Sequence, residues 1–127
     1  MPAKILVIDD EPAVANVITH MLRGYDTSAE TDPRRAVDRI THGERFDLIL
    51  CDLNMPEMSG RDVYEAVQRE YGGRPPMMLI MSGQGNIEPL YAAGCGVLFK
   101  PFEEAELENL VSAILHESAR EELDPAR

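Results

Sequence analysis

Long apolar runs are missing from this sequence. A membrane-spanning helix needs about 20 consecutive apolar residues, and no uninterrupted apolar stretch approaches that length. The first residues, Met1 to Lys4, lead straight into a short apolar segment without the pattern of a cleavable signal peptide. From these absences we expect a cytoplasmic protein that does not insert into membranes.

Basic residues are scarce as well. The sequence of 127 residues has 12 Lys and Arg against 23 Asp and Glu, a formal net charge of -11 at pH 7. A protein with this charge repels the phosphodiester backbone of nucleic acids and the surface of anionic lipids. We therefore expect no direct binding to nucleic acid.

Cysteine and histidine are few and scattered. Cys51 and Cys95 lie among apolar residues and show no C-x-x-C spacing, which is typical of reduced, buried thiols rather than of a disulfide or a metal site. His20, His42 and His116 are far apart in the sequence, so they form no cluster for zinc. We interpret the histidines as ordinary surface residues.

The residues that are present indicate one globular domain. A hydrophobic content of 44% and a charged content of 28% fit a single compact core. No internal repeat, low-complexity tract or interdomain linker precedes Glu117. We predict a single domain over residues 1–127, with its core at about residues 3–116 and a helix end and tail over residues 117–127.

Short apolar runs recur along the chain, and each is typical of a strand that is buried on both faces. These runs are Ile5–Ile8, Phe46–Cys51, Met77–Met81 and Val97–Phe99. The segment over residues 25–31 is more polar, and it suits a half-exposed strand at the edge of a sheet.

Helix signals lie between these strands. Helix starts are indicated at Pro12, at Asp32 with Pro33, and at Ser59 with Asp62, and helix ends at Gly24, Gly43 and Gly72. The first and last helices each carry an apolar stripe, formed by Val14, Val17, Ile18, Met21 and Leu22 and by Leu107, Leu110, Val111, Ile114 and Leu115.

Five predicted strands thus alternate with five predicted helices. Right-handed crossovers place such helices on both faces of a parallel sheet. With the polar strand at an edge, the pattern predicts a doubly wound α/β fold of the flavodoxin-like kind, with a five-stranded parallel sheet in the order 2-1-3-4-5.

Polar side chains follow the apolar runs at the point where each strand ends. They are Asp9, Asp10, Asp52, Ser82 and Lys100. A single aspartate there is usually a turn residue or a helix cap, but in a doubly wound fold all five meet at the crevice where ligands bind. Three carboxylates gathered at one rim repel one another unless a cation enters.

A hard divalent cation bound between the three carboxylates removes their mutual repulsion. Mg²⁺ (or Mn²⁺) prefers oxygen ligands and keeps several waters, so Asp10, Asp52 and the backbone carbonyl of Asn54 suffice as ligands, with Asp9 acting through a metal-bound water. An aspartate beside such a cation can attack phosphorus to give an acyl phosphate when fixed donors neutralise the phosphoryl oxygens. Lys100 and Ser82 are the candidate donors, and Gly83 leaves room beside them.

The joint pattern resembles the receiver domains of bacterial two-component response regulators, and in particular the chemotaxis regulators. The resemblance covers about residues 3–116 and rests on Val7–Glu11, Leu50–Pro56 with Gly60, Met81–Gly83 and Phe99–Phe102. It implies a Mg²⁺-dependent transfer of a phosphoryl group to Asp52 from a histidine kinase or a histidine phosphotransfer protein, with slow autodephosphorylation and no other turnover.

The resemblance also implies roles for single residues. Asp9 and Asp10 form the acidic pair, Ser82 is the hydroxyl that moves toward the phosphate, and Lys100 is its counter-ion. Family members usually carry Tyr or Phe three residues before the lysine, where this sequence has Val97. We expect the signal to pass to an unknown protein partner through the face between the fourth strand and the last helix.

Three alternatives stay open at this point. A haloacid-dehalogenase-like phosphatase also uses an aspartate nucleophile with Mg²⁺, but its motif needs a second acid where this chain has Asn54. A receiver-like docking module would bind partners without accepting phosphate. A flavin-binding protein needs a phosphate-cradling loop after the first strand, where this chain has Asp9, Asp10 and Glu11.

Overall fold

The computed structural model describes residues 2–73, 75–83 and 95–123, and the side chains of these residues up to Glu117. The five strands are β1 (Lys4–Ile8), β2 (Asp26–Glu30), β3 (Leu48–Asp52), β4 (Met77–Ser82) and β5 (Gly96–Phe99). The four helices of the described part are α1 (Pro12–Met21), α2 (Pro33–Thr41), α3 (Gly60–Tyr71) and α5 (Glu104–Leu123).

All strand pairs are parallel, and the order in the sheet is β2-β1-β3-β4-β5. This confirms the predicted doubly wound α/β fold and the position of the polar strand at an edge. The predicted helix between β4 and β5 falls on residues 84–94, which lie outside the described residues.

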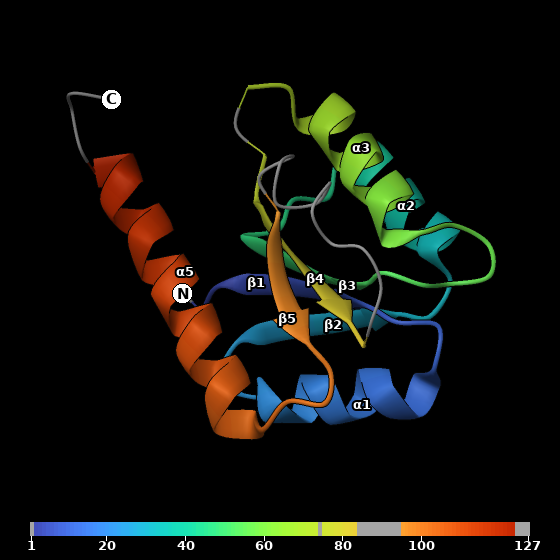
Figure 1. Cartoon of the computed structure of the whole chain (residues 1–127). Helices are drawn as coiled ribbons and strands as arrows, with labels where there is room; N and C mark the ends of the chain where they lie inside the picture. The colour runs from blue at the N-terminus through green and yellow to red at the C-terminus, as the bar shows by residue number, and fades with distance from the viewer. Residues whose placement is uncertain (1, 74, 84–94, 124–127) are drawn as a thin grey trace.

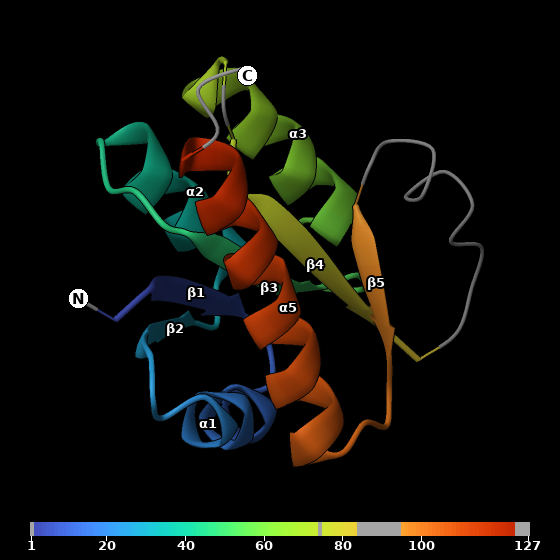
Figure 2. The same ribbon diagram turned by 90° about the vertical axis from the view of Figure 1, so that its left-hand side faces the viewer.

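The sheet lies between two layers of helices (Figure 1). Helices α2 and α3 cover one face, and α1 and α5 cover the other; Figure 2 looks onto α5 as it crosses the sheet. The core is accordingly divided into two clusters. Ile49 and Ile80 face α2 and α3, whereas Leu50 and Leu79 face α1 and α5, as expected from the two-residue period of a strand.

Most of the predicted helix signals are confirmed. Asp32 caps α2 by accepting a hydrogen bond from the backbone nitrogen of Arg34, and Ser59 and Asp62 form a capping box at α3. The apolar stripe of α1 is narrower than predicted, because Val17 remains 52% exposed. Among the described residues, none of the helices combines the length and the apolar character that a membrane crossing requires.

The edge strand β2 is held by polar contacts as well as by pairing with β1. Arg39 of α2 donates hydrogen bonds to Ser28 and Glu30 of β2 and to Glu44, and Glu44 also pairs with Lys4 of β1. This half-exposed polar strand is therefore held at the edge of the sheet by its side chains as well as by its backbone, since Ser28 and Glu30 are tied to a neighbouring helix.

Candidate functional site

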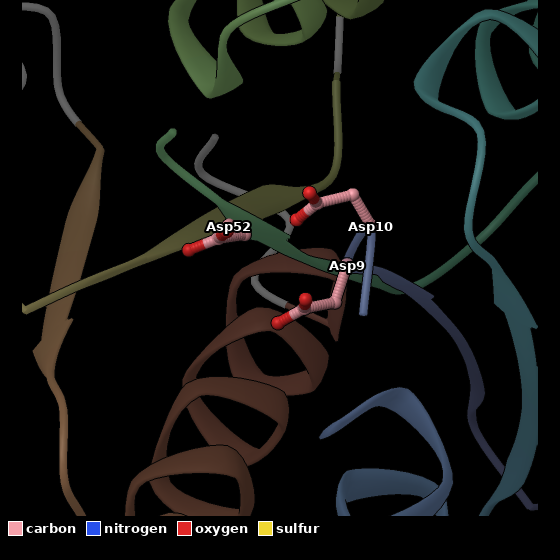
Figure 3. Close-up of side chains that lie close together, drawn as sticks. All are labelled: Asp9, Asp10 and Asp52. Carbon is pink, nitrogen blue, oxygen red and sulfur yellow. The ribbon is translucent and has the colours of Figure 1, made fainter. Parts of the chain in front are cut away.

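The candidate site lies at the rim where the parallel strands end. Asp9 follows β1, Asp52 is the last residue of β3, Ser82 is the last residue of β4, and Lys100 follows β5. Register pairing of Ile8 with Cys51 brings Asp9 beside Asp52. Figure 3 shows Asp9, Asp10 and Asp52 grouped at this rim.

The two-residue period of the strands decides which side chains meet. Two positions before Asp9, Asp52 and Lys100, the strands carry Val7, Leu50 and Leu98, which all belong to the cluster on the α1 and α5 face. The three charged residues therefore emerge on the same side of the rim. Ser82 belongs to the strand positions that face α2 and α3, because Ile80, two residues before it, lies in the cluster on that face.

Lys100 joins the two nearest carboxylates. Its Nζ donates to Asp9 Oδ2 at 3.1 Å and to Asp52 Oδ1 at 3.2 Å. The Asp9 side chain is only 1% exposed, and its other oxygen accepts a hydrogen bond from the backbone nitrogen of Glu11 at 3.0 Å. Both Asp9 oxygens are thus held, which fixes the position of Lys100 over Asp52.

The electrostatics of Asp52 favour a cation. Burial raises the pKa of the Asp52 carboxyl, and the negative charges of Asp9 and Asp10 raise it further. The charge and the hydrogen bond of Lys100 lower this pKa, but it stays above the ordinary value of aspartate. Burial lowers the pKa of Lys100, but its hydrogen bonds and charge interactions with Asp9 and Asp52 outweigh burial and raise it. Lys100 therefore remains a cation at neutral pH.

The three carboxylates form a group that can hold a metal ion. One carboxylate oxygen each from Asp9, Asp10 and Asp52 lies within 4.8 Å of the others. All three donors are hard oxygen atoms, and the Lys100 ammonium group contacts two of the three carboxylates. This donor set fits a hard divalent cation such as Mg²⁺ and offers no sulfur or imidazole for zinc.

Five of the predicted site residues thus lie at one rim. Asp9, Asp10 and Asp52 form the carboxylate group, and Lys100 contacts two of them. Ser82 is buried at the end of β4, next to the register partner of Asp52. Asn54 lies in the exposed loop that follows β3. The peptide bond from Lys100 to Pro101 is cis.

Two contacts of the site were missed by sequence reasoning. The Glu11 amide holds Asp9, and Gly60 packs against the backbone of Asp52. The first has a signal in the sequence, because aspartate commonly binds the amide two residues on. The contact between Gly60 and Asp52 depends on the path of the loop between β3 and α3, which a local sequence pattern does not predict.

The cysteines are buried and the histidines lie on the surface, as predicted. Cys51 and Cys95 are free and buried, and burial raises the pKa of both thiols, that of Cys95 to about 11. His20, His42 and His116 are exposed. None of these residues belongs to the described carboxylate group.

Comparison with known proteins agrees with this geometry. The family model of the response regulator receiver domain matches residues 5–112. The chain is 29% identical over 117 residues to the chemotaxis protein CheY of Pseudomonas aeruginosa, covering 87% of this chain and 94% of that protein. It is 32% identical over 131 residues to the DNA-binding response regulator MtrA of Mycolicibacterium smegmatis, covering 99% of this chain and 55% of that protein.

The chain therefore spans about half the length of MtrA. Among solved structures, it resembles the receiver domain of the sensor histidine kinase PA1611 from Pseudomonas aeruginosa PAO1, with a TM-score of 0.81 and 29% identity over 91% of this chain and 99% of that one. That receiver was solved with a magnesium ion coordinated in its active site cleft. With its fold, its rim of carboxylates and these matches, the chain belongs to the response regulator receiver domain family.

Proposed function

We propose that this domain accepts a phosphoryl group on Asp52 from a histidine kinase or a histidine phosphotransfer protein in a Mg²⁺-dependent reaction. The observation that carries the proposal is the position of Asp52, which lies within 4.8 Å of the Asp9 and Asp10 carboxylates and 3.2 Å from Lys100 Nζ. A nucleophilic carboxylate, a set of oxygen donors for a cation and a fixed ammonium group are thereby combined at one rim.

In the proposed transfer, a carboxylate oxygen of Asp52 forms a bond to phosphorus while the bond from phosphorus to the donor's histidine nitrogen breaks. The electron pair returns to the imidazole nitrogen, which takes up a proton. Asp10, Asp52 and the Asn54 carbonyl would hold Mg²⁺, with Asp9 acting through a water molecule. Bound Mg²⁺ would supply positive charge for the phosphoryl oxygens.

Lys100 is the second source of positive charge. Its Nζ is held beside Asp52 by Asp9, so it needs little reorganisation to contact a phosphoryl oxygen. Ser82 is placed on the neighbouring strand, and we assign its hydroxyl to the same phosphoryl group. Slow loss of the phosphoryl group to water is the only other reaction that we assign to the domain.

We assign the output to a population shift. A phosphoryl group adds negative charge beside Lys100 and Ser82, and their new contacts favour another packing of the face from β4 to α5. A protein partner would recognise that face. Since Val97 stands where the family usually has an aromatic residue, the shift in this chain proceeds without a ring at that position.

Uptake of phosphate from acetyl phosphate tests the proposal. Intact mass measurement should show one added phosphoryl group on the wild type with Mg²⁺, and none after Mg²⁺ is removed with a chelator or after Asp52→Asn. Absence of uptake by the wild type would favour a docking module, and steady hydrolysis of phosphomonoesters would favour a phosphatase. Absence of uptake by the wild type, or equal uptake by Asp52→Asn, would refute phosphoacceptance on Asp52, whereas steady hydrolysis of phosphomonoesters would refute a signalling role without other turnover.

A further inference from the structure

Gly60, the first residue of α3, lies directly against the backbone of Asp52. A Cβ atom at this position would lie 2.7 Å from the Asp52 carbonyl oxygen, 3.1 Å from Leu53 Cα and 3.2 Å from Ile80 Cδ1. Carbon and oxygen atoms in contact ordinarily stay about 3.3 Å or more apart. A side chain at Gly60 therefore requires the backbone around Asp52 or the start of α3 to move.

The backbone around Asp52 is held on its other sides. The Leu53 nitrogen donates to the Met81 oxygen of β4 at 2.9 Å, and Cys51 Sγ donates to the Asp52 oxygen at 3.3 Å. Gly60 itself donates from its backbone nitrogen to the Leu53 oxygen at 2.8 Å. The peptide unit after Asp52 thus moves only if it gives up its bond to β4, and the peptide unit after Leu53 is tied to α3.

The start of α3 is fixed as well. Ser59 Oγ accepts from the Asp62 nitrogen and the Ser59 nitrogen donates to Asp62 Oδ2, both at 3.1 Å. The Val63 nitrogen donates to the Ser59 oxygen at 3.1 Å. Because both partners are anchored, the missing side chain of Gly60 sets the spacing between α3 and the end of β3.

We propose that Gly60 is a positioning residue for the site: its contact with the Asp52 carbonyl fixes the Asp52 carboxylate relative to Asp9 and Asp10, together with the Asn54 carbonyl. This inference rests on the proposed function. The three carboxylates shown in Figure 3 must meet around one cation. A shift of the Asp52 backbone misplaces the carboxylate and the loop carbonyl at the same time.

Gly60→Ala tests the inference, with Gly24→Ala as its control because an added Cβ at Gly24 meets no atom within 4 Å. Misplacing a reacting group by about 1 Å can slow a reaction by about a hundredfold. We expect Gly60→Ala to weaken Mg²⁺ binding and to slow labelling by acetyl phosphate at saturating Mg²⁺ by roughly tenfold or more each. Calorimetric titration measures the former, and Gly24→Ala should leave both unchanged.

A double variant separates positioning from packing. Ile80→Val removes the Cδ1 atom that a new Cβ would meet, but it leaves the contact with the Asp52 oxygen. Relative to Ile80→Val alone, Gly60→Ala in this background should therefore lose less thermal stability than in the wild type, while Mg²⁺ binding stays weak. Recovery of Mg²⁺ affinity together with stability would show that Gly60 acts only through core packing, and would overturn the inference.

The wild type separates this inference from the proposed function. If the wild type binds Mg²⁺ and takes up phosphate, and Gly60→Ala does both equally well, the positioning role alone is wrong. If the wild type does neither, the proposed function fails and the positioning role fails with it.

Discussion

At the scale of single residues, the site depends on how Lys100 balances buried negative charge. Its two hydrogen bonds join a side chain that is 1% exposed, Asp9, to one that is 13% exposed, Asp52. Removing one partner of a buried ion pair leaves the other charge buried without compensation. Lys100 therefore both stabilises the fold and competes with a divalent cation for the same carboxylates.

Lys100→Met separates these two effects, because it keeps an apolar stem and removes the charge. We expect the free energy of unfolding without Mg²⁺ to fall by about 2 kcal/mol, less than for a fully buried pair because Lys100 is partly exposed. Mg²⁺ should bind more tightly, since its competitor is gone, while labelling by acetyl phosphate slows. Urea denaturation and calorimetric titration measure the two quantities.

Lys4→Met is the matched control for this variant, since Lys4 pairs with Glu44 far from the rim. It should leave Mg²⁺ affinity unchanged. Weaker Mg²⁺ binding in Lys100→Met would contradict the competition that we describe.

Asp52 gives a prediction with a defined pH dependence. Its pKa is raised in the folded protein, chiefly by burial, so the folded state prefers the protonated form. The corresponding contribution to stability is present below the ordinary pKa of aspartate and is lost as the pH rises through the folded pKa. Ionised Asp52 therefore lowers stability at neutral pH, and Asp52→Asn should raise it.

We expect Asp52→Asn to raise the melting temperature at pH 7 without Mg²⁺ by about 4 °C, the effect of about 1 kcal/mol in a domain of this size. The difference should shrink as the pH falls toward about 4, because the wild-type carboxyl then takes up its proton. Scanning calorimetry over this pH range measures the effect, with Asp38→Asn on the exposed face of α2 as control. A lower melting temperature for Asp52→Asn at pH 7 would show that the ion pair with Lys100 outweighs burial.

At the scale of elements, the residue that caps α3, Ser59, directly precedes Gly60, which contacts the backbone of Asp52. Ser59→Ala removes the side-chain half of the capping box, a change that costs about 1 kcal/mol at typical helix starts. Urea denaturation should show this loss, and Ser112→Ala on the exposed side of α5 should show none. Equal stability of Ser59→Ala and the wild type would mean that Gly60 is held by its other contacts alone.

The elements also show what the sequence can predict. The rim of Asp9, Asp52 and Lys100 could be predicted because each residue directly follows a short apolar run, and parallel strands end at one edge. The contact of Gly60 with Asp52 could not, since it arises from the path of the intervening loop. The exposure of Val17 was missed for a related reason: an apolar stripe gives the buried face of a helix but not how much of it the neighbouring elements cover.

At the scale of the whole molecule, an ion-pair network ties β1, α2 and the loop between α2 and β3 together. Glu44 accepts from Arg39 Nε at 3.0 Å and lies 3.1 Å from Lys4 Nζ. The hydrogen bond from Arg39 is the main reason why the pKa of Glu44 is lowered from 4.5 to about 2. The contribution of this group to stability is therefore present above pH 4.5 and is lost as the pH falls toward about 2.

Glu44→Gln should lower the free energy of unfolding at pH 7 by about 1 kcal/mol, a value that allows for solvent screening of a partly exposed pair. The stabilities of the wild type and the variant should converge as the pH falls toward about 2, because Glu44 takes up its proton there. Urea denaturation from pH 2 to pH 7 gives both curves. Glu65→Gln, which alters an exposed pair within α3, is the control and should show the same pH dependence as the wild type. If the free energies of unfolding of Glu44→Gln and the wild type differed by the same amount at all pH values, the role of the network would be contradicted.

The measurement that tests the central claim most directly is to locate the phosphoryl group within the chain. Borohydride reduces an acyl phosphate of aspartate to homoserine, so treatment after incubation with acetyl phosphate and Mg²⁺ marks the acceptor permanently. Peptide mass mapping should then find homoserine at position 52 and unaltered aspartate at Asp9 and Asp10. Homoserine at either of those positions, or at none of the three, would contradict the assignment of Asp52 as the phosphoacceptor.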